Sequence, residues 1–281
     1  MFSRIAYHSI RRVFKKVGLG SFYLTIIHPY LSPKESVIKT EDGKIFFIDP
    51  RYDNIQRHLF VYRKPYEQAV TRWLKANVSP GMSVIEIGAH IGFHAVEICR
   101  LVTREGRVVL VEPLPTNYLK LKRNLEANNQ DWAQCLQLAI SDNHGKVKIR
   151  NSKDGAITSL HSKNHDRYGM NTVEVQTITL DELLLSENME TLDLLQLDVE
   201  GAEAIILNEK QLALSEKRIS TILCEFHGML LLTNFSVHPT EFIERVQSFG
   251  YEISELLPTG LTRPLDLTSF DPQTRCHLVF H

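Results

Sequence analysis

Asp198, Glu225 and His227 are titratable residues that stand at the ends of two apolar segments. Asp198 follows residues 192–197, and Glu225 and His227 end residues 219–227. If these segments are neighbouring parallel strands, the three side chains meet beyond the strands' carboxyl ends, where ligands bind in such sheets. Glu225 and His227 are two positions apart, so they share one side of their strand. Because unpaired charges are rarely buried, the set indicates a functional site, although each acid alone could equally be a surface residue.

Two kinds of chemistry suit this set. The imidazole of His227 titrates near neutrality, so it could act as a general base that Glu225 or Asp198 orients. Alternatively, Asp198 and Glu225 could hold a hard divalent cation that binds a substrate oxygen. We place the catalytic role on His227, Asp198 and Glu225 and favour the base over the metal.

A second candidate site is the turn that follows the apolar residues 84–87. This segment contains Glu86 and runs into Gly-x-x-x-Gly at Gly88 and Gly92, followed by residues at helical spacing. The pattern predicts a buried strand, a tight turn and a helix start. Glycines let a ligand approach the main chain, and free N–H groups at a helix start favour a negatively charged ligand group. The dinucleotide fingerprint G-x-G-x-x-G is not met, since His90 stands at its second glycine.

Two further acids follow strand-like segments. Glu112 follows residues 107–111 and lies close to the offset from a glycine turn at which an acid binds ribose hydroxyls. Asp142 follows residues 134–140 and could accept the exocyclic amine of an adenine; as an alternative, it belongs to an ordinary Ser-Asp-Asn-His-Gly turn. The predicted cofactor-binding residues are therefore Glu86, Gly88, Ala89, His90, Gly92, Glu112 and Asp142.

The elements that must position these residues alternate from residue 80 onward. Strands are expected at 84–87, 107–111, 134–140, 192–197, 219–227, 251–256 and 276–280, and helices at 93–102, 115–128 and 239–249. Residues 146–150 and 172–179 form an expected antiparallel pair around a polar loop, 151–171. The loop could close over a substrate through His161, His165 and Arg167. This order predicts an α/β domain over 80–281.

Residues 1–79 are expected to form an N-terminal extension. It would contain a basic amphipathic helix within residues 1–20, a hairpin at 36–49 and a helix at 65–76. The basic helix could rest weakly on an anionic membrane surface or pack on its own domain. The apolar run after it is too short and broken to span a bilayer.

Composition narrows the function classes. The chain has 281 residues, with 32 basic and 33 acidic ones, so it offers no overall positive field for gripping nucleic acid. Its four cysteines, Cys99, Cys135, Cys224 and Cys276, form no Cys-x-x-Cys pair and are expected to be free thiols, which fits a reducing cytoplasm.

The chain resembles the FkbM family of class I S-adenosylmethionine (SAM)-dependent methyltransferases from about residue 66 to its last strand. Six segments carry the resemblance: 84–92, 111–113, 139–142, 179–183, 197–203 and 224–227. Glu86 and His90 stand where the family usually has Asp and Asn. The resemblance implies a Rossmann-like sheet of seven strands with the last one antiparallel, SAM as cofactor, and methyl transfer to a hydroxyl of a sugar, glycan or polyketide-like small molecule.

Other classes fit less well. A nicotinamide oxidoreductase would share the fold but needs the missing glycine. A nucleobase-amine methyltransferase normally has an Asn/Asp-Pro-Pro-aromatic turn where Asp198-Val199-Glu200-Gly201 stands. A catalytically inactive scaffold or membrane-surface protein would bind no SAM.

Overall fold

The computed structural model describes residues 34–150 and 172–281, which fall into two compact units. The smaller unit contains residues 34–66, and the larger unit begins at Glu67. Residues 67–79, which the sequence analysis assigned to the extension, are thus grouped with the larger unit. The predicted basic helix in residues 1–20 and the predicted loop 151–171 lie outside the described residues.

The smaller unit contains a hairpin and one helix. Strands β1 (Ser36–Lys39) and β2 (Ile45–Ile48) pair antiparallel, so the predicted hairpin is confirmed. Helix α4 (Asn54–Tyr62) follows and was not predicted. The Asp53 carboxylate accepts the Gln56 N–H at 2.7 Å, which is an N-cap that satisfies one of the free donors of the first turn.

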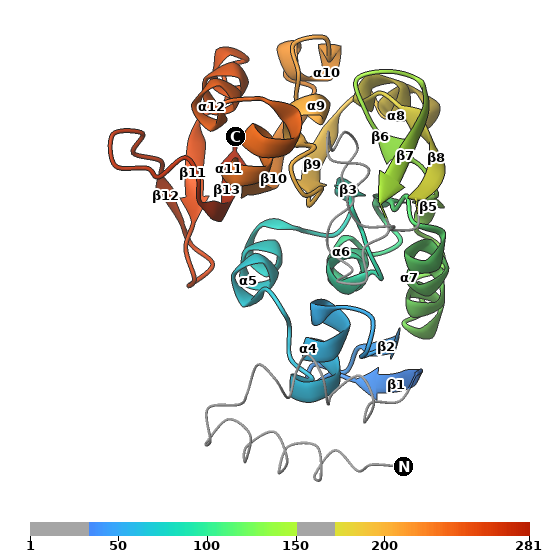
Figure 1. The fold of residues 1–281 in the computed structure, drawn as a ribbon. Helices are drawn as coiled ribbons and strands as arrows, with labels where there is room; N and C mark the ends of the chain where they lie inside the picture. The colour runs from blue at the N-terminus through green and yellow to red at the C-terminus, as the bar shows by residue number, and fades with distance from the viewer. Residues whose placement is uncertain (1–33, 151–171) are drawn as a thin grey trace. The chain divides into compact units, whose positions relative to one another are not determined.

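The larger unit follows the expected alternation of strands and helices (Figure 1). Its first half comprises α5 (Gln68–Asn77), β3 (Ser83–Ile87), α6 (Phe93–Val102), β4 (Arg107–Val111), α7 (Pro115–Ala127), β5 (Gln134–Leu136), β6 (Ala139–Ile140) and β7 (Gly145–Arg150). Its second half comprises β8 (Thr172–Ile178), α8 (Leu180–Ser186), β9 (Leu192–Leu197), α9 (Glu203–Ile206), α10 (Leu212–Ser215), β10 (Ile219–His227), α11 (Gly228–Leu230), the π-helix η2 (Leu231–Phe235), α12 (Pro239–Ser248), β11 (Ile253–Leu256), β12 (Thr262–Pro264) and β13 (Arg275–Phe280).

The main sheet has the strand order β12-β11-β13-β10-β9-β3-β4-β5. Strands β10, β9, β3, β4 and β5 are parallel, and β13 inserts antiparallel between β10 and β11, as expected for the last strand. Within residues 34–150 and 172–281, the sheet has eight strands rather than seven because the short β12 pairs with the edge of β11.

The predicted strand over 134–140 is two separate strands. Only β5 joins the main sheet, whereas β6 pairs parallel with β8 in a three-stranded sheet of order β6-β8-β7. The predicted antiparallel pair on either side of residues 151–171 is confirmed as β7 and β8. The sequence could not show the break, because apolar residues continue through Leu136 and Leu138.

Side chains alternate between the two faces of the main sheet. Ile85 and Ile87 on β3 join a core with Leu184 of α8 and Phe242 of α12. Because side chains of a strand alternate, Glu86 points to the opposite face, where α6 packs on β3 and β4. The buried carboxylate of Glu86 therefore lies on the face that α6 covers.

The four cysteines form no disulfide; Cys99 and Cys224 are buried, and Cys135 and Cys276 are half-buried. Among the described residues, no helix combines the length and apolar character needed to cross a bilayer.

Candidate active site

The carboxyl ends of β3, β4, β9 and β10 meet at one edge of the main sheet. Leu197, the last residue of β9, pairs with both Ile87 of β3 and Cys224 of β10. Asp198 and Glu225, the next residues, are therefore level with the turn after β3. The Asp198 N–H donates to the Ile87 carbonyl at 3.1 Å. The turn after β3 and the residues at the ends of β9 and β10, predicted as two sites, thus lie side by side as two halves of one edge of the main sheet.

The turn after β3 has the tight geometry that the sequence predicts. Gly88 and Gly92 have φ angles of 91° and 87°, in the left-handed region that side chains disfavour. A Cβ on Gly88 would lie 1.9 Å from the Asp198 carbonyl oxygen, and one on Gly92 would lie 2.8 Å from a methyl carbon of Leu121. Both glycines are therefore required by close packing within the chain. His90 also adopts a positive φ of 51°.

Glu112 fixes this turn through its carboxylate. Its Oε2 accepts the His90 N–H at 2.8 Å, and its Oε1 accepts the Leu114 N–H at 2.9 Å. Glu112 is buried, and burial raises its pKa, although the charge of His90 and the two N–H groups act in the opposite direction. The Gly88 and Ala89 N–H groups are both directed to the Val111 carbonyl. Glu112 thus joins the ends of β3 and β4, and its remaining lone pairs could accept ligand hydroxyls.

Glu86 is the least satisfied carboxylate of this half. Its side chain is buried, and its Oε2 has no hydrogen-bond partner among the described residues. Burial, together with the nearby charge of Glu112, raises the pKa of Glu86 to about 8. An orphaned acid of this kind favours a ligand that brings a positive charge or a donor, because such a ligand would stabilise its ionised form.

Asp142, the last predicted cofactor residue, follows β6 and so belongs to the three-stranded sheet. Its Oδ1 accepts from Ser141 Oγ at 3.2 Å and from Asn143 Nδ2 at 2.9 Å. These contacts are those of the turn that the sequence offered as the alternative, and contact with adenine stays a prediction.

The other half of the edge is the His227 cluster, which we define as Asp198, Glu200, Glu203, Glu225 and His227. His227 Nδ1 lies 3.2 Å from Glu203 Oε1. Its Nε2 lies 3.2 Å from Glu200 Oε2 and 3.7 Å from Glu225 Oε2. The expected proximity of Glu225 and His227 is therefore confirmed.

Glu203 and Glu200 are the contacts that the sequence analysis missed. Glu203 is fully buried, and its Oε1 also accepts the Gly201 N–H at 3.1 Å. We predicted that Glu225 or Asp198 would orient the imidazole, but Glu203 holds Nδ1. Both residues lie within segment 197–203, which carries part of the family resemblance. The spacing of the acids in that segment could have indicated their role.

The charges of the His227 cluster are strongly interdependent. Burial and the neighbouring Glu225 raise the pKa of Asp198 well above its usual value, and burial raises that of Glu200 to about 7. Burial alone would lower the pKa of His227, but the hydrogen bond and charge of Glu203, with the charges of Glu225 and Glu200, raise it. Burial and neighbouring carboxylates thus disfavour ionisation of Asp198 and Glu200.

Basic side chains contact the rim of the cluster. Arg275 Nε of β13 donates to Glu225 Oε1 at 2.6 Å. Glu67, at the start of α5, lies 2.9 Å from His94 Nε2 and 3.7 Å from His277 Nε2. Burial acts to raise the pKa of Glu67, but the hydrogen bonds with His277 and His94 outweigh it and lower the pKa. Glu67 is thus a carboxylate with two imidazole partners of its own.

The backbone at Glu200 is strained. Glu200 has a φ of 52°, and the following Gly201 has a φ of 99°. A Cβ on Gly201 would lie 2.8 Å from Leu230 Cβ and 2.9 Å from Phe235 Cε2, so this loop is pressed against α11 and η2. A non-glycine residue in the left-handed region costs about 1–2 kcal/mol, and π-helices recur near functional sites. Both features agree with a site at this loop.

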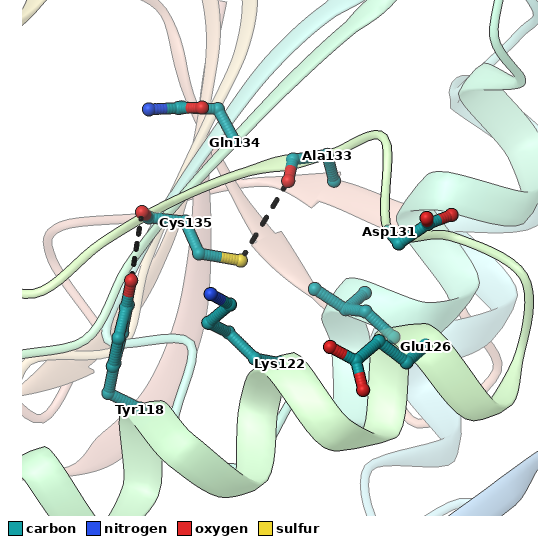
Figure 2. A pocket seen from close by; sticks show the side chains of 8 residues that line it. Tyr118, Lys122, Glu126, Asp131, Ala133, Gln134 and Cys135 are labelled. Atoms are coloured by element: carbon teal, nitrogen blue, oxygen red, sulfur yellow. Dashed lines mark hydrogen bonds between the residues drawn. The ribbon is translucent and has the colours of Figure 1, made fainter.

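A separate hollow of about 280 Å³ lies between α7 and β5 (Figure 2). Tyr118 and Lys122 of α7 face Cys135 across it, and the Tyr118 hydroxyl lies 3.4 Å from the Cys135 carbonyl oxygen. None of its lining residues is a predicted site residue. The hollow is therefore distinct from the sheet edge described above.

A family comparison identifies the chain. The model described as the methyltransferase FkbM domain matches residues 86–253, which is more than half of the sequence. The chain belongs to the FkbM family of SAM-dependent methyltransferases. The matched segment contains both halves of the sheet edge, from Glu86 to His227, so the predicted family and class of enzyme are confirmed.

Comparison with other proteins adds little beyond this. No curated protein sequence matches the chain. Among solved structures, it is similar to fibrillarin of Aeropyrum pernix with bound SAM, at 13% identity and a TM-score of 0.41, covering 89% of this chain and 94% of that one. It is also similar to a SAM-dependent O-methyltransferase of Thermotoga maritima, at 12% identity and a TM-score of 0.42, covering 92% and 96%. At these scores the likeness carries no argument about activity.

The residues present fit the cofactor of this family. Glu86 stands two residues before Gly88, and a ligand with an ammonium or another donor would satisfy its orphaned Oε2. Glu112 retains acceptor capacity beside the same turn. Glu86, His90 and Glu112 are therefore the residues that would hold SAM, which supplies a methyl group bonded to a positively charged sulfur.

Proposed function

We propose that this FkbM methyltransferase methylates a hydroxyl oxygen of a sugar, glycan or polyketide-like small molecule. The observation that carries the proposal is the position of the His227 cluster. It lies beyond β9 and β10, and the Asp198 backbone contacts both Ile87 and Gly88 at the cofactor turn. Imidazole and carboxylates beside a methyl donor suit an acceptor that must lose a proton.

We assign different roles to the two halves of the sheet edge. Glu86, His90 and Glu112 would hold the cofactor, while the His227 cluster would orient the acceptor hydroxyl and weaken its O–H bond. Most of the acceleration would come from alignment of the hydroxyl oxygen with the methyl group. Deprotonation aids the reaction because an alcohol is a weak nucleophile, and general-base assistance contributes about 10²–10⁴-fold. The roles of His227 as base and of Asp198 and Glu225 as its partners stay predictions.

We further propose a cytoplasmic location and a small-molecule or glycan acceptor rather than nucleic acid. The unpaired cysteines and the even balance of charge support these two statements. They do not identify the acceptor.

The test uses purified full-length protein, methyl-labelled SAM and a panel of hydroxylated acceptors, starting with glycans. Titration calorimetry first measures SAM binding, with NAD as the competing class of ligand. We expect SAM binding, no NAD binding, and a labelled methyl ether identified by NMR. Methyl transfer to nitrogen or carbon would overturn the O-methylation proposal. The absence of SAM binding would instead favour a catalytically inactive scaffold.

A further inference from the structure

We propose that the His227 cluster binds a first-row divalent transition cation through Asp198, Glu200 and His227. In the proposed function, this cation would hold the acceptor hydroxyl. Only that role of the cation rests on the proposed function. The binding of the ion itself is independent of methyl transfer.

The first argument is the burial of the His227 imidazole. Its Nδ1 lies 3.2 Å from Glu203 Oε1, which leaves Nε2 as the ring nitrogen that faces the rest of the cluster. His227 is only 5% exposed, and its Nε2 has no hydrogen-bond partner among the described residues. A buried imidazole nitrogen of this kind can bind a divalent transition cation.

The second argument is what surrounds Nε2. Carboxylate oxygens of Glu200 and Glu225 lie 3.2 Å and 3.7 Å away. A cation bound among these atoms would gain favourable contacts with the imidazole nitrogen and with carboxylate oxygen.

The third argument is the geometry of the ligand set. One oxygen each from Asp198 and Glu200 and one nitrogen of His227 all lie within 4.8 Å of one another. Ligands at about 2.1 Å from one ion can be at most roughly 4.2 Å apart, so a small approach of the side chains would complete the set. Asp198 and Glu200 are both partly exposed, which leaves room for such an approach and for an open coordination position.

The contact between Glu203 and Nδ1 supports the same assignment. Histidines that bind metals almost always donate their second N–H to a carboxylate or carbonyl, which fixes the ring and raises its basicity. Glu203 is itself held by the Gly201 N–H and is fully buried. The ring is therefore fixed with Nε2 directed into the cluster.

A neighbouring group of Glu67, Glu225 and His277 also has the residue types of a metal site. Its carboxylates already have side-chain partners, since Glu67 contacts the His94 imidazole at 2.9 Å and Glu225 accepts from the Arg275 guanidinium at 2.6 Å. The Asp198–Glu200–His227 set is thus the better ligand set. One imidazole nitrogen with carboxylate oxygens suits Mn²⁺, Fe²⁺ or Zn²⁺ better than Ca²⁺, which prefers oxygen ligands alone.

Such an ion would change the role of His227 from base to ligand. An acceptor hydroxyl that binds the open position becomes more acidic, and its O–H bond breaks as the proton passes to the Glu225 carboxylate. The oxygen would keep the electron pair of that bond and form a bond to the methyl carbon, while the methyl–sulfur bond of SAM breaks and S-adenosylhomocysteine leaves with its electron pair.

The experiment measures Mn²⁺ binding to the chelator-treated full-length protein by the loss of the free-ion EPR signal, with Zn²⁺ as competitor. No SAM or acceptor is added. We expect one equivalent to bind, with affinity falling roughly 100-fold in Glu200→Gln and Asp198→Asn and unchanged in Glu216→Gln, an exposed control. Both variants keep the size of the native side chain, and circular dichroism checks their fold.

Equal affinity in the wild type and in folded Glu200→Gln would place the ion elsewhere and overturn the proposal. The absence of binding of both metals to the wild type would do the same. Methyl transfer is measured separately. Metal binding without methylation would contradict the proposed function alone, whereas EDTA-insensitive methylation without metal binding would contradict the metal site alone.

Discussion

The two halves of the sheet edge hold their carboxylates in different ways. At the cofactor turn, Glu112 is fixed by main-chain N–H groups, and Glu86 has an oxygen without a partner. In the His227 cluster, Glu200, Glu203 and Glu225 contact the side chains of His227 and Arg275, and Glu203 also accepts the Gly201 N–H. Backbone donors fix a carboxylate in one place, whereas side-chain partners can be exchanged for a ligand. We therefore expect the cofactor turn to control binding and the His227 cluster to control turnover.

The largest effect should come from His227→Ala. Removal of the imidazole abolishes either the base or the metal ligand, so we expect the rate of methyl transfer to fall about 10²–10⁴-fold while SAM affinity changes little. Turnover and titration calorimetry give the two quantities. His144→Ala is the control, because His144 is exposed and distant in sequence from the cluster. Unimpaired turnover in His227→Ala would show that His227 is neither the general base nor a required metal ligand.

The next effect is the pH dependence of stability at Glu86. The pKa of this carboxyl is 4.5 in the unfolded chain and about 8 in the folded protein. Above pH 4.5 the unfolded chain therefore loses this proton more readily than the folded protein does, which favours unfolding. The free energy of unfolding of the ligand-free protein should therefore fall between about pH 5 and 8. Glu86→Gln should remove most of that fall, which is on the order of a few kcal/mol. Urea denaturation at several pH values checks this, and parallel pH profiles for both proteins would contradict it.

Glu112→Ala tests the cofactor half more directly. The variant loses the acceptor for ribose hydroxyls and frees the His90 and Leu114 N–H groups, so we expect SAM affinity to fall roughly tenfold or more. Calorimetry measures the dissociation constant, and Glu105→Ala, an exposed acid, is the control. A loss of turnover at saturating SAM would show that Glu112 acts in methyl transfer rather than in cofactor binding, and would contradict this prediction.

The smallest effect concerns Glu203 as a positioning residue. Glu203→Gln keeps a hydrogen bond to Nδ1 but removes the charge, so Mn²⁺ affinity should fall about tenfold with SAM affinity unchanged. A merely structural role would lower the melting temperature and both affinities together. Comparison of the two titrations therefore distinguishes positioning from folding.

Much of the fold could be predicted because hydrophobic periodicity is local. The strands of the main sheet and the hairpin before it follow apolar segments of the right length. Asp198, Glu225 and His227 could be brought together because carboxyl ends of parallel strands share one edge. These predictions needed no knowledge of side-chain packing.

What was missed depends on tertiary contacts. Helix α4 is short, and its start at Asp53 is marked only by a cap. The third strand divides between two sheets, which no apolar pattern reveals. Glu203 lies on α9 and reaches His227 across the cluster, so its role depends on how that helix packs rather than on strand order.

The position of β13 has a consequence for the order in which the site is assembled during synthesis. This strand lies between β10 and β11 and supplies Arg275 to Glu225 and His277 to Glu67. A growing chain that has been made only as far as β11 has the cofactor turn and the acids of the His227 cluster, but not these two partners. The family fold can therefore begin to form on the ribosome, while Glu225 and Glu67 gain these partners only when residues 275–280 have left the exit tunnel.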